Sequence, residues 1–342
     1  VVGYHRIPAV LPVAPPGRGL TESQRVRRAI SASLAGSGLV EVLCYPFAAE
    51  ADAERWTPGR PAVRLANPID GAAPFLRTSL WPGLVQAARR NRSRGLTDLA
   101  LFELGRVFLP EPGAAYGSDA LPGVAARPAP DVLAGLDASL PPQPWHLGAL
   151  FAGDAVPRQP GVAAVPTGIA DAVGAARRLA EALGLRLVVA PGAHPERVGW
   201  AGELLPSLAE ELDLPRVVPV LELDVDALVA AGLEAERRDV ARRAAPISAF
   251  PAATQDVSLL VPAGTVVGEL LAAFVAGAGP LLEDARLVDE YRGPGVADGA
   301  VSLTFALRFR APDRTLTQAE ATEAKLAGVA AAAERFGAAI RD

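Results

Sequence analysis

The stretch Val301-Ser302-Leu303-Thr304-Phe305-Ala306-Leu307-Arg308-Phe309-Arg310 alternates large apolar side chains with small or polar ones over ten residues. Successive side chains of a β-strand point to opposite faces of its sheet, so this alternation predicts a strand with one buried and one open face. Residues 257–261 alternate in the same way, and residues 281–292 contain a further strand that ends before the turn Gly293-Pro294-Gly295. The sequence therefore predicts a sheet in this part of the chain.

Two helices are predicted between these strands. Residues 266–278 form the first, and Thr317 with Glu320 makes a capping box that begins the second, which ends at Gly337. With a short last strand at residues 338–341, the order becomes β-α-β-β-α-β, the ferredoxin-like split βαβ arrangement. Both helices then cover one face of a four-stranded sheet and leave the other partly open.

The open face is predicted to carry Ser302, Thr304, Arg308 and Arg310. RNA-recognition modules use such a face, usually through aromatic side chains that stack on bases. The strand at residues 301–310 places no aromatic residue on this face, so its sequence does not support general base stacking.

The first 240 residues predict a larger α+β domain with an antiparallel or mixed sheet. Its first helix begins at the N-cap Thr21, which forms a capping box with Gln24 and precedes an apolar stripe. Residues 109–144 are rich in Pro and Gly and are expected to be loose, and residues 237–246 form a charged linker. The other predicted elements are strand 40–47, helix 84–90, strand 99–108 broken at Gly105, strand 147–151, helix 169–183, strand 185–189, helix 204–212 and strand 217–223.

Composition narrows the classes of function. The net charge of −5 argues against a broad surface that coats nucleic acid. The sequence contains no apolar run long enough for a membrane span and no signal peptide. Its single cysteine can form no internal disulfide, and a reducing, cytoplasmic setting is the simplest fit. Cys44 is interpreted as a core residue, and His5, His146 and His194 as surface or hydrogen-bonded residues, so no metal site is predicted. The chain contains no Met and opens on Val1, which indicates a piece of a longer protein.

Several motifs occur in order along the chain and carry a family resemblance. They are Gly3-Tyr4-His5-Arg6-Ile7-Pro8, Leu65-Ala66-Asn67-Pro68, Leu76-Arg77-Thr78-Ser79-Leu80-Trp81-Pro82-Gly83-Leu84, Leu101-Phe102-Glu103-Leu104-Gly105-Arg106-Val107-Phe108, Gly202-Glu203-Leu204-Leu205-Pro206, Phe250-Pro251-Ala252, Tyr291-Arg292-Gly293 and Thr315-Leu316-Thr317. Together they resemble the C-terminal part of the β subunit of bacterial phenylalanyl-tRNA synthetases. The resemblance implies the tail of a preceding small domain at residues 1–20, a non-catalytic class II synthetase-like domain at 21–240, and a ferredoxin-fold anticodon-binding domain at 246–342.

The resemblance also implies that this chain has no catalytic residue of its own. Arg77 and Glu103 stand where the second class II motif would place its Arg and Glu, and we interpret them as a degenerate pair kept for the fold and the interface. Residues 221–228 run acidic where the third motif requires Gly and Arg, and carboxylates there would repel a triphosphate. ATP and Mg²⁺ are expected for the assembled enzyme, and no cofactor is expected to bind this fragment. Editing would belong to parts that precede Val1.

The implied partners are a catalytic α subunit, with two αβ pairs forming the enzyme, and tRNA(Phe), but not DNA. The first helix is expected to lie at the subunit interface. Residues 246–342 contain twelve acidic and eight basic side chains, so this domain cannot bind RNA through bulk charge. Candidate residues for stacking on bases are Phe250 and Tyr291, and candidates for phosphate contacts are Arg292, Arg308, Arg310 and Arg314. The alternative is that these arginines pair with the domain's own carboxylates, such as Glu290 and Asp313.

One basic run remains open to two interpretations. Arg89, Arg90, Arg92 and Arg94 either form a solvated helix end or contact tRNA or the catalytic subunit. For the whole chain, the alternative function is that of a free-standing inactive synthetase paralogue. Its ferredoxin-like domain would then bind a regulatory ligand and have no role with tRNA.

Overall fold

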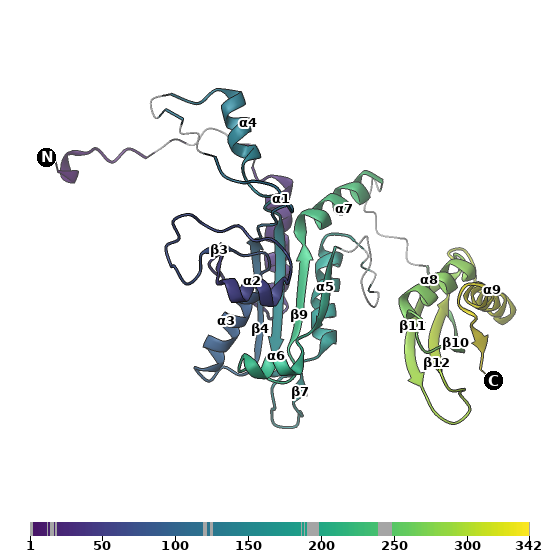
Figure 1. Ribbon diagram of the computed structural model, residues 1–342. Helices are drawn as coiled ribbons and strands as arrows, with labels where there is room; N and C mark the ends of the chain where they lie inside the picture. The colour runs from purple at the N-terminus through teal and green to yellow at the C-terminus, as the bar shows by residue number, and fades with distance from the viewer. Residues whose placement is uncertain are drawn as a thin grey trace. The chain divides into compact units, whose positions relative to one another are not determined.

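The computed structural model describes residues 3–11, 13, 17, 19–118, 122–123, 126–185, 187, 189, 198–238 and 248–341. These residues form two compact units (Figure 1). The first contains the described residues up to Leu187 together with residues 198–238, and the second contains Val189 and residues 248–341. The predicted α+β class and the ferredoxin-like second domain are confirmed.

A five-stranded mixed sheet forms the centre of the first unit. Its strand order is β1-β4-β5-β9-β8, in which β1 is parallel to β4 and the other neighbours are antiparallel. The strands are β1 (Val40–Glu41), β4 (Leu99–Arg106), β5 (Trp145–Ala152), β9 (Pro219–Asp224) and β8 (Gly199–Glu203).

Helices cover both faces of this sheet. On one face, α1 (Glu22–Gly36), α5 (Ile169–Ala182) and α7 (Val225–Arg238) pack over apolar side chains of the central strands. On the other face, α3 (Trp81–Arg92) lies over the sheet with α6 (Pro206–Glu211) beside it. The two faces alternate along each strand, so this second face, called the α3 face below, carries every other residue of β4, β5 and β9.

Smaller elements complete the first unit. They are the 3-10 helix η1 (Tyr4–Arg6), α2 (Glu50–Trp56), α4 (Pro130–Ala138), the pair β2 (Phe47–Ala48) and β3 (Phe75–Leu76), and the pair β6 (Asp154–Val156) and β7 (Val165–Pro166). The region at residues 109–144 was expected to be loose throughout, and α4 corrects that expectation. This helix begins with Pro130 in its first turn, where the missing N–H of proline costs no hydrogen bond.

The prediction of one buried strand at residues 40–47 is wrong. After β1, the Val42 N–H still donates to the Phe102 carbonyl, but the Cys44 N–H donates to the side chain of Glu103 instead of a strand partner. The chain therefore leaves the sheet, and the side chains of Leu43 and Tyr45 are 93% and 85% exposed. For the same reason Cys44 is only half-buried, which corrects its interpretation as a core residue.

The predicted break at Gly105 is also wrong, because β4 continues through it to Arg106. Glycine is required there by a close approach. A Cβ atom on Gly105 would lie 2.2 Å from the Arg77 guanidinium and 3.0 Å from the Leu80 side chain.

The first helix begins at Thr21, as predicted, with both hydrogen bonds of the capping box to Gln24 present. Its apolar stripe was expected to form a subunit interface. Ile30 and Leu34 are instead buried within the first unit, against α5 and α7. The described chain therefore covers the centre of this stripe by itself.

The second unit has the predicted β-α-β-β-α-β order, with the strand order β11-β12-β10-β13. Val301, Leu303, Phe305, Leu307 and Phe309 are all buried under the two helices, as their alternation predicts. The elements are β10 (Ala253–Pro262), α8 (Val267–Ala278), β11 (Leu282–Tyr291), β12 (Ala300–Phe309), α9 (Gln318–Phe336) and β13 (Ala339–Ile340).

The other face of this second sheet is less open than expected. Ser302 is only 1% exposed, which corrects its assignment to an open surface. In the register of the sheet it lies between Tyr291 of β11 and Leu260 of β10. These are larger side chains on the same face, and they flank the serine.

Some predictions concern residues outside the described ranges. The predicted strand at residues 185–189 includes two undescribed positions, and its described residues form no strand. Nearly all of the predicted linker at residues 237–246, and also His194, lie outside the described residues. Within the described parts of the chain, no helix is both long and apolar enough to cross a membrane.

Candidate functional site

The α3 face of the first sheet carries a buried ion pair between Arg77 and Glu103. Arg77 follows β3 and Glu103 lies in the middle of β4, and their side chains are 6% and 0% exposed. The Arg77 Nη1 atom lies 2.8 Å from Glu103 Oε1, and its Nε donates to the Arg106 carbonyl at 3.0 Å. The structure thus brings together the two residues that the sequence paired. Their guanidinium and carboxylate groups are directed at each other and at the protein, so neither is presented to a ligand.

A second buried carboxylate lies on the same face, at Glu222 of β9. The Ser79 hydroxyl donates to Glu222 Oε2 at 2.6 Å, and the Leu80 N–H donates to Oε1 at 3.4 Å. The Nδ1 atom of His146, on β5, lies 2.7 Å from the same Oε1. Sequence reasoning treated Glu222 as part of an acidic run and missed this cluster. The signal was available, because strand alternation places His146 and Glu222 on one face of neighbouring strands.

Helix α3 packs tightly onto the sheet between these polar groups. The side chains of Leu80 and Leu84 are fully buried and rest on Gly148 of β5. A Cβ atom at Gly148 would lie 2.8 Å from Leu84 Cδ1 and 2.9 Å from Leu80 Cβ. Leucine side chains, a neutralised arginine and two carboxylates therefore occupy this face. These residues do not fit a nucleoside triphosphate, which requires an open, positively charged surface.

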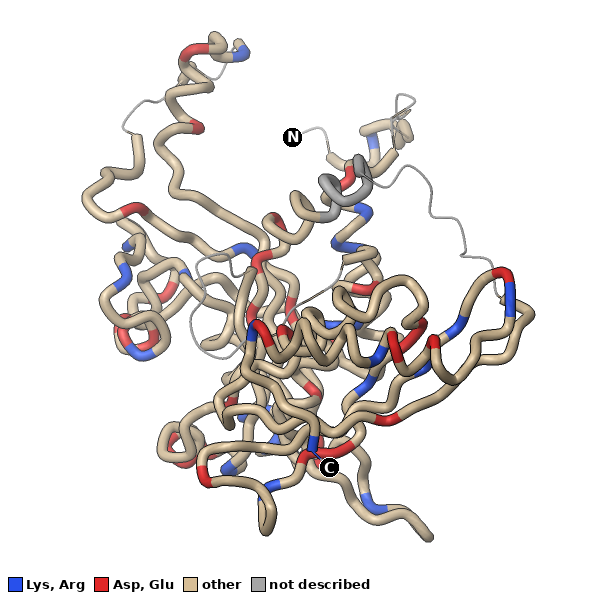
Figure 2. Tube along the Cα trace, turned by 90° about the vertical axis from the view of Figure 1, so that its right-hand side faces the viewer, with Lys and Arg blue, Asp and Glu red and all other residues tan. Residues whose placement is uncertain are grey.

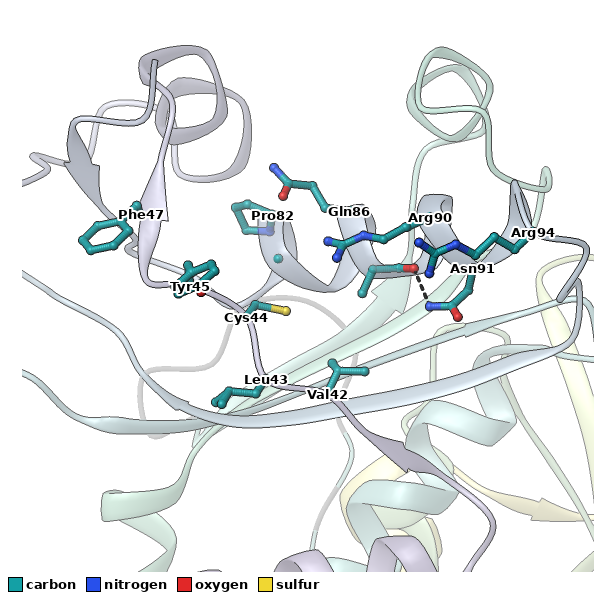
Figure 3. A pocket seen from close by; sticks show the side chains of 12 residues that line it. Val42, Leu43, Cys44, Tyr45, Phe47, Pro82, Gln86, Arg90, Asn91 and Arg94 are labelled. Carbon is teal, nitrogen blue, oxygen red and sulfur yellow. Dashed lines mark hydrogen bonds between the residues drawn. The ribbon is translucent and has the colours of Figure 1, made fainter. Parts of the chain in front are cut away.

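A cavity of about 370 Å³ lies on the outer side of α3 and is called the α3 pocket (Figure 3). In Figure 3, Gln86 and Arg90 of α3 and Arg94, which follows the end of α3, lie along one side, and the chain from Val42 to Phe47 runs along the other. The pocket residues are Val42, Leu43, Cys44, Tyr45, Phe47, Pro82, Gly83, Gln86, Ala87, Arg90, Asn91 and Arg94.

The Cys44 thiol at the pocket wall is not a nucleophile. Its burial, together with the neighbouring Glu103 carboxylate, raises the pKa of the Cys44 thiol to about 12. The nearby Arg77 and Arg90 cations lower this pKa only in part. At neutral pH the group is a protonated thiol, and thiolate is the form that reacts or binds metals.

The basic run at the end of α3 differs from the other arginines of the site. None of the ion pairs between described residues involves Arg89, Arg90, Arg92 or Arg94. Arg90 and Arg94 line the pocket, whereas Arg89 is exposed outside it. The Nε of Arg92 is buried and has no hydrogen-bond partner among the residues that the structure describes. The structure therefore separates this run into two pocket residues and two others.

In the second unit, the candidate tRNA-binding arginines all have carboxylate partners. Arg308 and Arg310 share Glu283 of β11, with Nε–Oε2 distances of 2.6 and 3.2 Å. Arg292 pairs with Glu290 and Arg314 with Glu320, and these contacts are solvent-exposed. Acidic and basic residues are interspersed along the described chain (Figure 2). Exposed pairs of this kind are weak, so Arg292, Arg308 and Arg314 can exchange partners. The Arg310 side chain is only 13% exposed and also donates to the Ser248 carbonyl at 3.0 Å, so it is held more firmly.

The two candidate stacking residues lie apart in the second unit. Tyr291 ends β11, its hydroxyl donates to the Pro294 carbonyl at 3.3 Å, and the Arg341 guanidinium lies 4.6 Å from its ring centroid. Phe250 precedes β10 and is partly buried. One face of the Tyr291 ring is thus covered by a cation, which reduces the surface it offers to a base.

Among the described residues, no group of three or more His, Cys, Asp or Glu side chains could hold a metal ion. The His146 imidazole faces a single carboxylate, and His5 lies in η1 at the exposed start of the chain.

Two family models match the chain. The model of the phenylalanyl tRNA synthetase beta chain CLM domain matches residues 7–225, and that of the ferredoxin-fold anticodon binding domain matches residues 248–341. The phenylalanine–tRNA ligase beta subunit of Leifsonia xyli subsp. xyli is 52% identical over 363 residues, covering 100% of this chain and 42% of that protein. The same subunit of Thermobifida fusca is 45% identical over 363 residues, covering 99% of this chain and 43% of that protein.

The chain spans about two fifths of the length of the curated relatives it matches. Among solved structures, a pyrrolysyl tRNA synthetase from Desulfitobacterium hafniense aligns with a TM-score of 0.43 and 14% identity. The alignment covers 61% of this chain and 66% of that one.

Proposed function

The chain belongs to the family of phenylalanyl-tRNA synthetase β chains, and we propose that it pairs with a catalytic α subunit and binds tRNA(Phe) for ATP-dependent aminoacylation. One observation carries the non-catalytic part of this proposal. On the α3 face, the Arg77 guanidinium is buried against Glu103 and the Glu222 carboxylate lies on the same face, an arrangement that does not suit the phosphates of ATP. Residues 21–240 would then serve as a structural module and residues 246–342 as the anticodon-binding domain.

The assembled enzyme would contain two αβ pairs in the cytoplasm, with ATP and Mg²⁺ held by the catalytic subunits. Residues 1–20 would end the small domain that precedes this module. The rival function, a free-standing regulatory paralogue, is not favoured. The relatives that match nearly all of the chain are named as β subunits of the ligase, and both domains match the corresponding family models.

The purified chain by itself should give no phenylalanine-dependent exchange of pyrophosphate into ATP. The physical reason is that the guanidinium of Arg77 on the α3 face is buried against Glu103 and is therefore not available to the phosphates. Exchange by the same chain assembled with its α subunit is the positive control. Exchange activity that stays with the isolated chain through successive purification steps would contradict the proposal.

Changing Arg308 and Arg310 together to Ala should weaken the binding of tRNA(Phe) by the assembled enzyme. If both arginines leave Glu283 to contact phosphates, the slope of log affinity against log salt should become shallower by about two. Phenylalanine activation should be unaffected, because these residues lie in the second unit. Filter binding over a series of salt concentrations measures both quantities.

The matched control is Glu283→Gln, which removes the carboxylate that both arginines share. It should leave tRNA affinity unchanged or raise it, since the arginines no longer have to leave an ion pair. If the Arg308/Arg310 double variant keeps wild-type affinity and wild-type salt dependence, the arginines serve only the domain's own carboxylates.

A further inference from the structure

The α3 pocket places two arginines that have no ion pair among the described residues next to exposed apolar side chains. Arg90 and Arg94 both line it, and neither forms an ion pair or a side-chain hydrogen bond with any residue in the described part of the chain. The chain as a whole is acidic, with a net charge of −5. Other exposed arginines, such as Arg177, also have no ion pair among the described residues, but Arg90 and Arg94 are distinguished by lining one recess together. The recess therefore holds two cations that have no carboxylate partner among the described residues.

Exposed apolar side chains line the same pocket as the two arginines. Leu43 and Tyr45 form the opposite wall and are almost entirely exposed, and Val40 just before them is more than half exposed. The Tyr45 ring stacks on Phe47 with the ring centroids 6.4 Å apart, which holds the tyrosine in place beside the pocket. Tyrosine and arginine around a recess, with exposed aliphatic residues next to them, form the composition that is enriched at protein–protein contacts.

We propose that the α3 pocket is a docking site for an acidic side chain of a protein partner, which enters between Arg90 and Arg94 while apolar residues of the partner cover Leu43 and Tyr45. Under the proposed function, on which this step rests, the partner is the catalytic α subunit. Docking would remove water from the guanidinium groups of Arg90 and Arg94. Because buried charges are stable only when they are paired, the partner would have to supply a carboxylate.

An RNA partner fits this surface less well. RNA backbones are bound along broad basic surfaces, whereas only two of the described arginines reach this pocket, and aliphatic side chains such as Leu43 gain nothing against phosphate. The four arginines of the basic run thus fall into two groups. Arg90 and Arg94 are assigned to the subunit contact, and Arg89 and Arg92 are left outside it.

The test compares single charge reversals in the complete chain and measures the affinity and the dissociation rate of the α subunit. Arg90→Glu and Arg94→Glu should each weaken α-subunit binding by about 30-fold or more, mainly through faster dissociation, because each would bury a carboxylate against the partner's carboxylate. Leu43→Ser should weaken binding in the same direction. The control is Arg177→Glu on α5, an exposed arginine with the same change in charge on the opposite face of the sheet, which should alter binding less than threefold.

Two outcomes would overturn the docking site. In one, the α subunit binds the wild-type chain but also binds the Arg90 and Arg94 variants equally well, which leaves the proposed function standing. In the other, the variants bind the α subunit normally and the assembled enzyme loses affinity for tRNA(Phe), which would assign the pocket to RNA. Failure of the wild-type chain to bind the α subunit would instead reject the proposed function. Thermal unfolding of each variant, expected to match the wild type because these side chains are at the surface, separates loss of binding from loss of fold.

Discussion

Replacing Arg77 with Met should lower the free energy of unfolding of the first unit by about 3–5 kcal/mol, because it leaves the Glu103 carboxylate buried without a counter-charge. Glu103 is completely inaccessible to solvent, so water cannot replace the lost guanidinium, and within the described chain its Oε2 already lacks a hydrogen-bond partner. Arg77 also donates to the carbonyls of Arg106 and Cys44, and these bonds would be lost as well.

The measurement can be restricted to the first unit by tryptophan fluorescence in a denaturant titration. All four tryptophans of the chain, at positions 56, 81, 145 and 200, lie in this unit. The double variant Arg77→Met/Glu103→Leu is the control, since removing both charges should recover most of the lost stability. A change below about 1 kcal/mol in the single variant would mean that the pair is solvated and that the α3 face is open to water.

Local patterns in the sequence predicted most of the fold. The ten-residue alternation at 301–310 placed every large apolar side chain of β12 correctly, because a strand with one covered face has a strict period of two, although it missed the burial of Ser302. Thr21 with Gln24 and Thr317 with Glu320 marked the starts of α1 and α9, since capping is a contact within four residues.

Predictions failed where a distant residue decides the local structure. The apolar run at residues 40–47 looked like a buried strand, but Glu103, 59 positions from Cys44, takes the Cys44 N–H away from the sheet. Gly105 looked like a break in β4, and it is instead the point where the Arg77 guanidinium crosses the strand. Neither contact has a signature in the local sequence.

In the candidate site, too, local patterns predict which face a residue lies on, but contacts with distant residues decide its partners. Alternation on the strands would place Glu103, His146 and Glu222 on one face, but their hydrogen bonds depend on how α3 packs over that face. In the second unit, the partners of Arg308 and Arg310 depend on the register of β11, which shifts between Leu282 and Asp284 and brings Glu283 to both. The roles of these residues in binding remain predictions, as do the domain limits.

Replacing Phe274 with Ala should destabilise the second unit by about 3–5 kcal/mol, because Phe274 is a fully buried aromatic residue between the two helices and the sheet. Its ring and its carbonyl oxygen each lie 2.9 Å from the place where a Cβ atom on Gly328 would sit, so α9 approaches α8 closely at this point. Gly328 has no side chain that could fill the cavity that the substitution creates. Phe274→Leu, which keeps most of the volume, should cost less than about 1.5 kcal/mol.

Two measurements on this variant test whether the first unit binds the α subunit and the second unit binds tRNA. The tryptophan signal reports the first unit alone, so its unfolding midpoint should stay at the wild-type value in Phe274→Ala, while circular dichroism shows the second unit melting earlier. In the assembled enzyme, tRNA(Phe) affinity should fall while binding of the α subunit is retained, since the docking residues Arg90 and Arg94 belong to the first unit. Leu326→Ala on the exposed side of α9 is the control and should change stability by less than about 0.5 kcal/mol. A variant that lost α-subunit binding and tRNA binding together would show that the two units do not act separately, and the assignment of one partner to each would have to be abandoned.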